Sequence, residues 1–169
     1  MSEQPEKTLS PEEAARVRES LGRAGKVVVL TNGCFDILHV GHIRYLRRAR
    51  ELGDFLVVGL NSDASVRALR GESRPIVPEA ERAEVLGALE SVDCVVIFSE
   101  RTAERLVEVI RPDVYVKGGD YAIDGAGGRD LPEARVVASY GGRVEIVPYI
   151  RGHSTTELIS AIVQKYCRR

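Results

Sequence analysis

Two of the chain's three histidines, His39 and His42, lie three residues apart in the segment TNGCFDILHVGH. On a helical turn this spacing places both imidazoles on the same face. There they could donate hydrogen bonds to phosphate oxygens and to the negative charge that develops in a transition state. Gly33 and Gly41 remove side chains where a ligand could approach the backbone, and free N–H groups at a helix start favour a phosphate. The segment therefore predicts one wall of a phosphate-binding site.

The two histidines also allow other interpretations. They could cap or pack at the start of a helix, which is the commoner role of a single histidine. Cys34, His39 and His42 could together hold zinc, but their spacing is not a usual one and the sequence offers no evident fourth ligand. We therefore expect no metal held by protein side chains here.

A second phosphate-binding pattern lies near the end of the chain, in GHSTTELI. Hydroxyl and backbone N–H groups at a helix start can bind phosphate together. Ser154, Thr155 and Thr156 are three such residues in a row, whereas N-capping, the alternative role, needs only one. Lys117, in VKGGD, is either a point charge for an anion or a solvated lysine at the end of a strand.

Other polar residues near predicted strand ends also have two possible roles. Asn61, Asp63 and Asp120 could bind hydroxyl groups of a sugar or nucleoside, or could cap turns. Arg82 could reach a phosphate, or could be an exposed charge on its helix. The loop LRGESRP contains two arginines and a glycine and could close over a polyphosphate.

Segments with the pattern of strands alternate along the chain with segments that have the pattern of helices. The fold that this alternation predicts determines where all of these residues lie. The alternation predicts an α/β fold: a Rossmann-like, doubly wound parallel sheet of five strands, with helices on both faces. Ligands bind such sheets beyond the carboxyl ends of the strands, where the strand order reverses. The expected strands lie at residues 26–31, 55–61, 94–98, 113–119 and 143–148. The expected helices lie at residues 10 to 22 or 25, 43–53, 78–92, 102–110, 133–140 and 154–166.

The composition predicts an ordinary globular domain. The chain has 169 residues, 44% of them hydrophobic, and a formal net charge of −1, which gives no support to a nucleic-acid or anionic-membrane surface. Its three scattered cysteines fit a reducing compartment, and its polar N-terminus lacks the apolar stretch of a signal peptide. We expect a flexible tail at residues 1–9, a single domain at residues 10–169, and a cytoplasmic protein with no nucleic-acid or membrane partner.

Three common motifs are absent from the sequence. No G-x-G-x-x-G follows the first predicted strand, and GRAGKV lacks the spacing of a P-loop. No G-x-S-x-G occurs either. The sequence therefore supports neither a nicotinamide dinucleotide site nor a P-loop, and it weakens the case for an α/β-hydrolase.

H-x-G-H after the first strand, together with S-T-T at the start of the last helix, resembles the cytidylyltransferase-like nucleotidyltransferase superfamily. Within it, TNGCFDILHVGHIRYLRRARELGD, NSDASVRALRGESRPI, ERAEVLGALESVD, PDVYVKGGDY and GHSTTELI are similar to the heptose-1-phosphate adenylyltransferase domain of bacterial ADP-heptose synthases. The similarity runs from Ser10 to Ile162. The sugar-kinase domain that accompanies it in those synthases does not occur in this chain, so we expect a stand-alone transferase.

The resemblance implies an HxGH-type nucleotidyltransferase that transfers AMP from ATP to D-glycero-D-manno-heptose 1-phosphate, releases pyrophosphate, uses Mg²⁺ with ATP and forms a homodimer. By the superfamily's pattern, the catalytic residues are His39, His42 and Lys117. The nucleotide-binding residues are Asn32, Gly33, Cys34, Phe35, Gly41, Ser154, Thr155 and Thr156. The residues expected to contact the acceptor or the nucleoside are Asn61, Asp63, Arg82, Gly119 and Asp120.

Two alternatives remain open on the sequence. Another phosphate, such as glycerol 3-phosphate or FMN, could be the acceptor, and CTP could be the donor. Tyr149 stands where glycerol-phosphate cytidylyltransferases carry an arginine near the base, which favours ATP. The second alternative is a non-catalytic nucleotide-binding module, but such a module need not keep the transition-state groups His39 and His42.

Overall fold

A five-stranded parallel sheet forms the centre of the chain, with the strand order β3-β2-β1-β4-β5. The computed structural model describes residues 7–119, 130–148 and 153–167. The strands are β1 (Val28–Gly33), β2 (Phe55–Asn61), β3 (Cys94–Phe98), β4 (Val114–Gly118) and β5 (Arg143–Val147). This confirms the predicted α/β fold, because every strand pair in the described sheet is parallel and the sheet is wound in both directions from β1.

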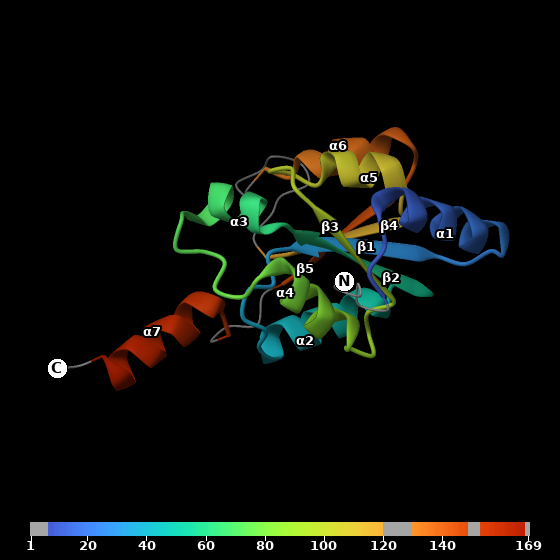
Figure 1. Cartoon of the computed structure of the whole chain (residues 1–169). Coiled ribbons are helices and arrows are strands. Elements are labelled where there is room, and N and C mark those ends of the chain that lie inside the picture. The colour runs from blue at the N-terminus through green and yellow to red at the C-terminus, as the bar shows by residue number, and fades with distance from the viewer. Residues whose placement is uncertain (1–6, 120–129, 149–152, 168–169) are drawn as a thin grey trace, which may run out of the picture.

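Helices cover both faces of the sheet (Figure 1). The helices α1, α5 and α6 pack on one face, and α2 and α4 pack on the other. The helices are α1 (Pro11–Arg23), α2 (Val40–Arg50), α3 (Asp63–Arg70), α4 (Glu79–Gly87), α5 (Glu104–Ile110), α6 (Pro132–Ser139) and α7 (Thr155–Tyr166). None of the helices among the described residues is both long and apolar enough to cross a bilayer.

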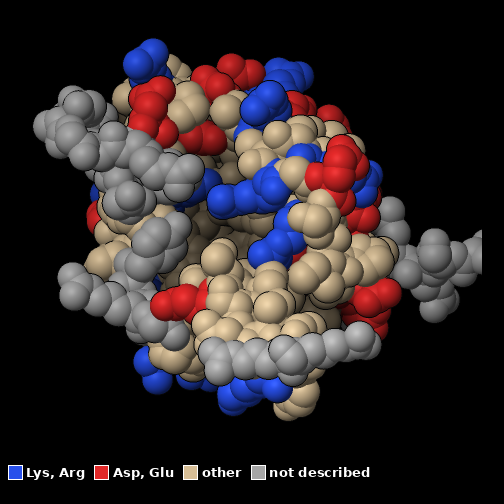
Figure 2. All heavy atoms as spheres, turned by 90° about the vertical axis from the view of Figure 1, so that its left-hand side faces the viewer, with Lys and Arg blue, Asp and Glu red and all other residues tan. Residues whose placement is uncertain are grey.

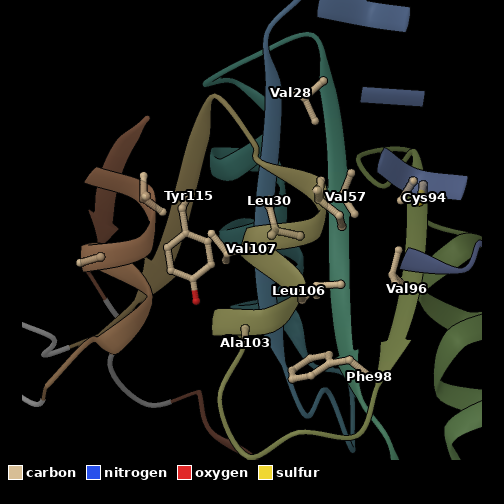
Figure 3. Close-up of a cluster of buried hydrophobic side chains, with 14 of the residues drawn as sticks. Val28, Leu30, Val57, Cys94, Val96, Phe98, Ala103, Leu106, Val107 and Tyr115 are labelled. Atoms are coloured by element: carbon tan, nitrogen blue, oxygen red, sulfur yellow. The ribbon is translucent and has the colours of Figure 1, made fainter. Parts of the chain in front are cut away.

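The core consists of two clusters, one on each face of the sheet. Along β1, Val28 and Leu30 point into the cluster beneath α1, α5 and α6, whereas Val29 points into the cluster beneath α2 and α4. Figure 3 shows the first cluster, where Leu106 and Val107 of α5 face the strand side chains. The continuous apolar runs of the strands are explained by burial on both faces.

The strand order reverses between β1 and β4. The chain proceeds from β1 to β2 and β3 on one side, and then crosses to β4 and β5 on the other side. The connections that leave β1 and β4 therefore diverge, which opens a crevice at the carboxyl ends of these two strands. Asn32 and Gly33 end β1, and Lys117 and Gly118 end β4, so the predicted motifs lie at this crevice.

The structure differs from the predicted elements at several places: α4 ends at Gly87, five residues before the predicted end, and α2 begins at Val40, three residues before the predicted start. Helix α3 was not predicted; it is short, and Ser62 caps it by accepting a hydrogen bond from the N–H of Ser65. At residues 7–9, which the sequence analysis placed in a flexible tail, Thr8 pairs with Val95 at the edge of β3 and the Lys7 ammonium donates to the carbonyl of Val92. These contacts are made by backbone and charged groups, which leave no hydrophobic pattern in the sequence.

Candidate active site

A cavity of about 1270 Å³ opens at the carboxyl ends of the strands. It is larger than the usual site for one small ligand, so it has room for a nucleotide and a second substrate. Figure 2 shows this side of the molecule, where lysine and arginine atoms flank the hollow. The predicted residues that line the cavity are Asn32, Gly33, Cys34, Phe35, His39, Gly41, His42, Asn61, Lys117, Ser154, Thr155 and Thr156.

Lys117 and Asn32 join the two strands that flank the reversal of strand order. The Lys117 Nζ donates to Asn32 Oδ1 at 2.8 Å, and the Tyr115 hydroxyl donates to the same oxygen at 2.6 Å. These contacts hold the ammonium beside the carboxyl ends of β1 and β4, where Lys117 lines the cavity. Lys117 is not simply a solvated lysine at a strand end.

His39 is the N-cap residue of α2, and its Nδ1 accepts a hydrogen bond from the N–H of Gly41 at 3.2 Å. Burial lowers the pKa of His39, and the neighbouring His153 lowers it further. A neutral imidazole that accepts at Nδ1 must carry its proton on Nε2. The capping role and the phosphate role are therefore compatible, because capping fixes the tautomer that leaves Nε2–H as a donor beside the cavity.

His42 packs between two rings. It stacks on His39 with ring centroids 3.9 Å apart and meets the edge of Phe35 at 5.3 Å. Burial, and secondly the closeness of His39, lower the pKa of His42 to about 4, so the ring is neutral at pH 7. Its Nδ1 is buried and has no hydrogen-bond partner among the described residues. A buried polar atom without a partner calls for a ligand or water.

Both predicted glycines of the first motif make room for rings of the site itself. A Cβ on Gly41 would lie 2.9 Å from two atoms of the His39 imidazole, and a Cβ on Gly33 would lie 3.0 Å from the Phe35 ring. The sequence analysis assigned this space to a ligand, whereas in the structure the side chains of the motif occupy it.

The turn that follows β1 is held from several directions. Phe35 has a φ of 44°, in the left-handed region that residues other than glycine rarely adopt. The Asp36 carboxylate accepts from the N–H groups of Ile76 and Val77 and from the Arg74 guanidinium. Burial alone would raise the pKa of Asp36, but these hydrogen bonds outweigh it and lower the pKa. The contacts fasten the turn to the segment before α4.

The start of α7 forms another part of the wall. Ser154 is the N-cap residue, and its hydroxyl accepts from the N–H of Glu157 at 3.1 Å. Thr155 and Thr156 follow and also line the cavity. Capping accounts for the Ser154 hydroxyl, and the two threonines provide further hydroxyl groups beside the positive end of the helix dipole.

Three predicted acceptor-binding residues do not line the described cavity: Asp63, Arg82 and Gly119. Arg82 is buried, so it is not an exposed helical charge, and its guanidinium contacts protein groups. Asp63 pairs with Arg82 at 2.7 Å. Asp120 and Tyr149 lie outside the described residues.

Three further arginines line the cavity: Arg70, which belongs to the loop LRGESRP that the sequence analysis associated with a polyphosphate, and Arg44 and Arg101, which it did not single out. They come from the end of α3, α2 and the β3–α5 connection. None has a hydrogen bond or ion pair within the described part of the chain. Sequence spacing could not identify Arg44 and Arg101, because each is one of several arginines in its segment and only the fold brings them beside Arg70.

The acidic residues of the cavity do not form a metal-binding cluster. In the described ranges, no group of three or more His, Cys, Asp or Glu side chains is placed to hold a metal ion. Asp36 is occupied by Arg74 and two N–H groups, and Glu133 accepts from the N–H of Ala103. Two further acidic residues, Asp130 and Glu157, also line the cavity.

A Rossmann-like sheet with paired histidines after β1 and a hydroxyl-rich helix start at the same edge defines a nucleotidyltransferase-like domain. The chain belongs to the cytidylyltransferase-like family, whose sequence model matches residues 30–161. This confirms the resemblance that the motifs indicated.

Curated relatives are similar to most of this chain. The bifunctional protein HldE of Geobacter metallireducens is 55% identical over 152 residues, which cover 90% of this chain and 30% of that protein. The bifunctional protein HldE of Koribacter versatilis is 61% identical over 132 residues, which cover 78% of this chain and 26% of that protein. The chain thus spans less than a third of the length of these relatives.

A solved structure is also similar. The crystal structure of the lipopolysaccharide core biosynthesis protein from Thermoplasma volcanium matches with a TM-score of 0.59 and 30% sequence identity. The match covers 76% of this chain and 100% of that one. The family and its fold therefore rest on both sequence and structure.

Proposed function

We propose that this domain transfers AMP from ATP to a sugar 1-phosphate, with D-glycero-D-manno-heptose 1-phosphate as the acceptor. The observation that carries the proposal is the pair of stacked, neutral histidines beside the cavity, with His39 fixed in the tautomer that donates from Nε2. The acceptor follows from the motifs shared with heptose-1-phosphate adenylyltransferase domains, and it is supported by the bifunctional HldE relatives.

The reaction needs positioning and charge stabilisation rather than an activated protein nucleophile. An oxygen of the acceptor phosphate attacks the α-phosphorus of ATP, the bond from that phosphorus to the bridging oxygen breaks, and pyrophosphate leaves. The attacking phosphate is already ionised at neutral pH, so no general base is required. His39 Nε2–H, His42 and the Lys117 ammonium stabilise the charge that develops on the reacting phosphates.

The acceptor enters on the side of the cavity formed by α3 and the β3–α5 connection. Arg70 and Arg101 lie there without an internal partner in the described residues, so their guanidinium groups are available to a phosphate. The opposite wall, with Ser154 to Thr156, takes the β- and γ-phosphates of ATP. This division leaves His39, His42 and Lys117 between the two substrates.

We further propose that Mg²⁺ enters with ATP. Its function when bound is to offset charge on the triphosphate, and because the described side chains form no group of three or more metal ligands, we expect the phosphates and water to supply most of its ligands. Isothermal titration of ATP with and without Mg²⁺ tests this; equal affinities in both titrations would contradict it.

A homodimer is also part of the proposal. Helix α7 presents apolar side chains to solvent, and Ile162 and Tyr166 are 52% and 80% exposed. A second copy of the chain would remove this surface from water. Sedimentation equilibrium of the chain and of Ile162→Glu tests it: we expect a dimer that the substitution weakens, and a monomer at all concentrations would contradict the proposal.

A substrate panel tests the assignment of donor and acceptor. Pyrophosphate release is measured with ATP or CTP against heptose 1-phosphate, glycerol 3-phosphate and FMN, with Mg²⁺ present. We expect the highest kcat/KM with ATP and heptose 1-phosphate. A higher kcat/KM with CTP and glycerol 3-phosphate, or with ATP and FMN, would assign the domain to another acceptor class.

A further inference from the structure

Arg82 lies beneath the cavity and joins the ends of two strands. It belongs to the first turn of α4, and its side chain is fully buried. Its Nη1 donates to the carbonyl of Cys34 at 2.6 Å and to the carbonyl of Asn61 at 2.9 Å. Cys34 directly follows β1, and Asn61 ends β2. One guanidinium nitrogen therefore connects the carboxyl ends of neighbouring strands.

The remaining contacts of Arg82 leave the guanidinium little freedom. Nε donates to the carbonyl of Val77 at 2.9 Å, and Nη2 donates to Asp63 Oδ1 at 2.7 Å. Four of its five N–H groups thus have protein partners. Arg82 does not line the described cavity, and its contacts are backbone carbonyls and one carboxylate.

The contact with Cys34 determines the direction of the next N–H group. The Cys34 carbonyl and the Phe35 N–H belong to one planar, trans peptide, so they point in opposite directions. Because the carbonyl points to the buried Arg82, the Phe35 N–H points away from it, and both Cys34 and Phe35 line the cavity. This N–H makes no hydrogen bond within the described residues.

The orientation of this peptide needs support, because Phe35 has a positive φ. We infer that Arg82 is a positioning residue: it holds the Cys34–Phe35 peptide so that the Phe35 N–H donates to the nucleotide's α-phosphate. The inference rests on the proposed function for the identity of that ligand. It replaces the predicted role of Arg82 as an acceptor-binding residue.

The kinetic test uses Arg82→Lys, which keeps the charge but cannot reach four partners with planar geometry. We expect kcat to fall on the order of 100-fold while the KM of the acceptor changes less than threefold. Arg105→Lys, an exposed substitution on α5, serves as the control and should leave both values unchanged. A large rise in the acceptor KM with little change in kcat would instead show direct contact with the acceptor. An unchanged kcat would overturn the inference.

A second variant tests the donor itself while Arg82 stays in place. Incorporation of phenyllactic acid at position 35 replaces the N–H by an ester oxygen and keeps the side chain. We expect a similar loss of kcat, and we expect Arg82→Lys to add little to that loss, since both changes remove the same interaction. Fully additive losses would overturn the inference, and this variant remains informative if Arg82→Lys does not fold.

A measurement on nucleotide binding alone separates this inference from the proposed function. The amide proton of Phe35 is followed by NMR during titration with ATP and Mg²⁺. We expect a downfield shift in the wild-type chain that is lost in Arg82→Lys and retained in Arg105→Lys. Nucleotide binding without this shift overturns the role of Arg82, whereas a shift without turnover on any acceptor overturns only the proposed reaction.

Discussion

The imidazole of His42 stacks on that of His39, with the ring centroids 3.9 Å apart and the ring planes inclined by 29°. Two imidazoles at this distance repel each other if both are positively charged, and burial also opposes the charged form of each ring. This agrees with the proposal that the two histidines act as neutral N–H donors that bind charge and do not transfer protons.

The low pKa of His42 makes stability depend on pH. An unfolded histidine takes up a proton near pH 6.5, whereas folded His42 does so only near pH 4. Between these values the unfolded state binds more protons, so the free energy of unfolding falls as the pH falls. Urea unfolding at pH 7.5 and 4.5 should show a larger loss for the wild type than for His42→Gln. Equal losses would contradict the low pKa.

Gly41→Ala tests whether the space beside His39 matters. The new Cβ would lie 2.9 Å from the His39 ring and 3.1 Å from the Cβ of His153, so the ring must move. We expect kcat to fall at least about tenfold, because a displaced donor loses its alignment. The control is Gly87→Ala, where only Lys7 lies near, at 3.6 Å. If steady-state kinetics give the wild-type kcat for both Gly41→Ala and Gly87→Ala, the exact position of the His39 ring is not critical.

Lys117→Met removes the charge at the crevice between β1 and β4. We expect kcat to fall by about 10²–10³-fold, as for other donors to developing charge. Lys26→Met, at the amino end of β1, serves as the control because Lys26 pairs with Asp54 outside the cavity. If the two methionine variants lose kcat equally, the contribution of Lys117 is not local to the site.

Alanine variants of two cavity arginines can be compared with alanine variants of arginines that lie nearby in the sequence. Arg70→Ala and Arg101→Ala should each raise the KM of the acceptor about tenfold, because each removes a guanidinium from the acceptor side. Arg67→Ala and Arg105→Ala change the net charge equally but lie outside the cavity lining. The KM of the acceptor is measured at constant ionic strength for each cavity variant and its control. If the two variants of a pair raise this KM equally, the arginines act by general electrostatic attraction and do not form a subsite.

Much of the fold could be predicted from the sequence, because strands buried on both faces are continuous apolar runs, whereas amphipathic helices repeat apolar residues every three to four positions. The same alternation of strands and helices predicted that His39 and Lys117 lie at one edge of the sheet, because the carboxyl ends of parallel strands meet there. The order of the strands could not be read in this way, since it depends on which segments pair in space. Helix α3 was missed because it is short, with eight residues.

The role of Arg82 shows where sequence reasoning ended. The sequence predicted that Arg82 could reach a phosphate, whereas in the structure its side chain binds the carbonyls of Cys34, Asn61 and Val77. Every residue type carries a backbone carbonyl, so such partners leave no sequence signal. For the same reason, the pairing of Lys7 to Leu9 with β3 could not be predicted.

The most direct test of the central claim measures pyrophosphate release from ATP and D-glycero-D-manno-heptose 1-phosphate in the presence of Mg²⁺. The wild-type chain is compared with His39→Ala, His42→Ala and the control Gly87→Ala. We predict turnover by the wild type and the control, and a loss of about 10²–10³-fold in kcat for each histidine variant. Wild-type turnover that persists unchanged in both histidine variants, or nucleotide binding without any pyrophosphate release by the wild type, would contradict the account.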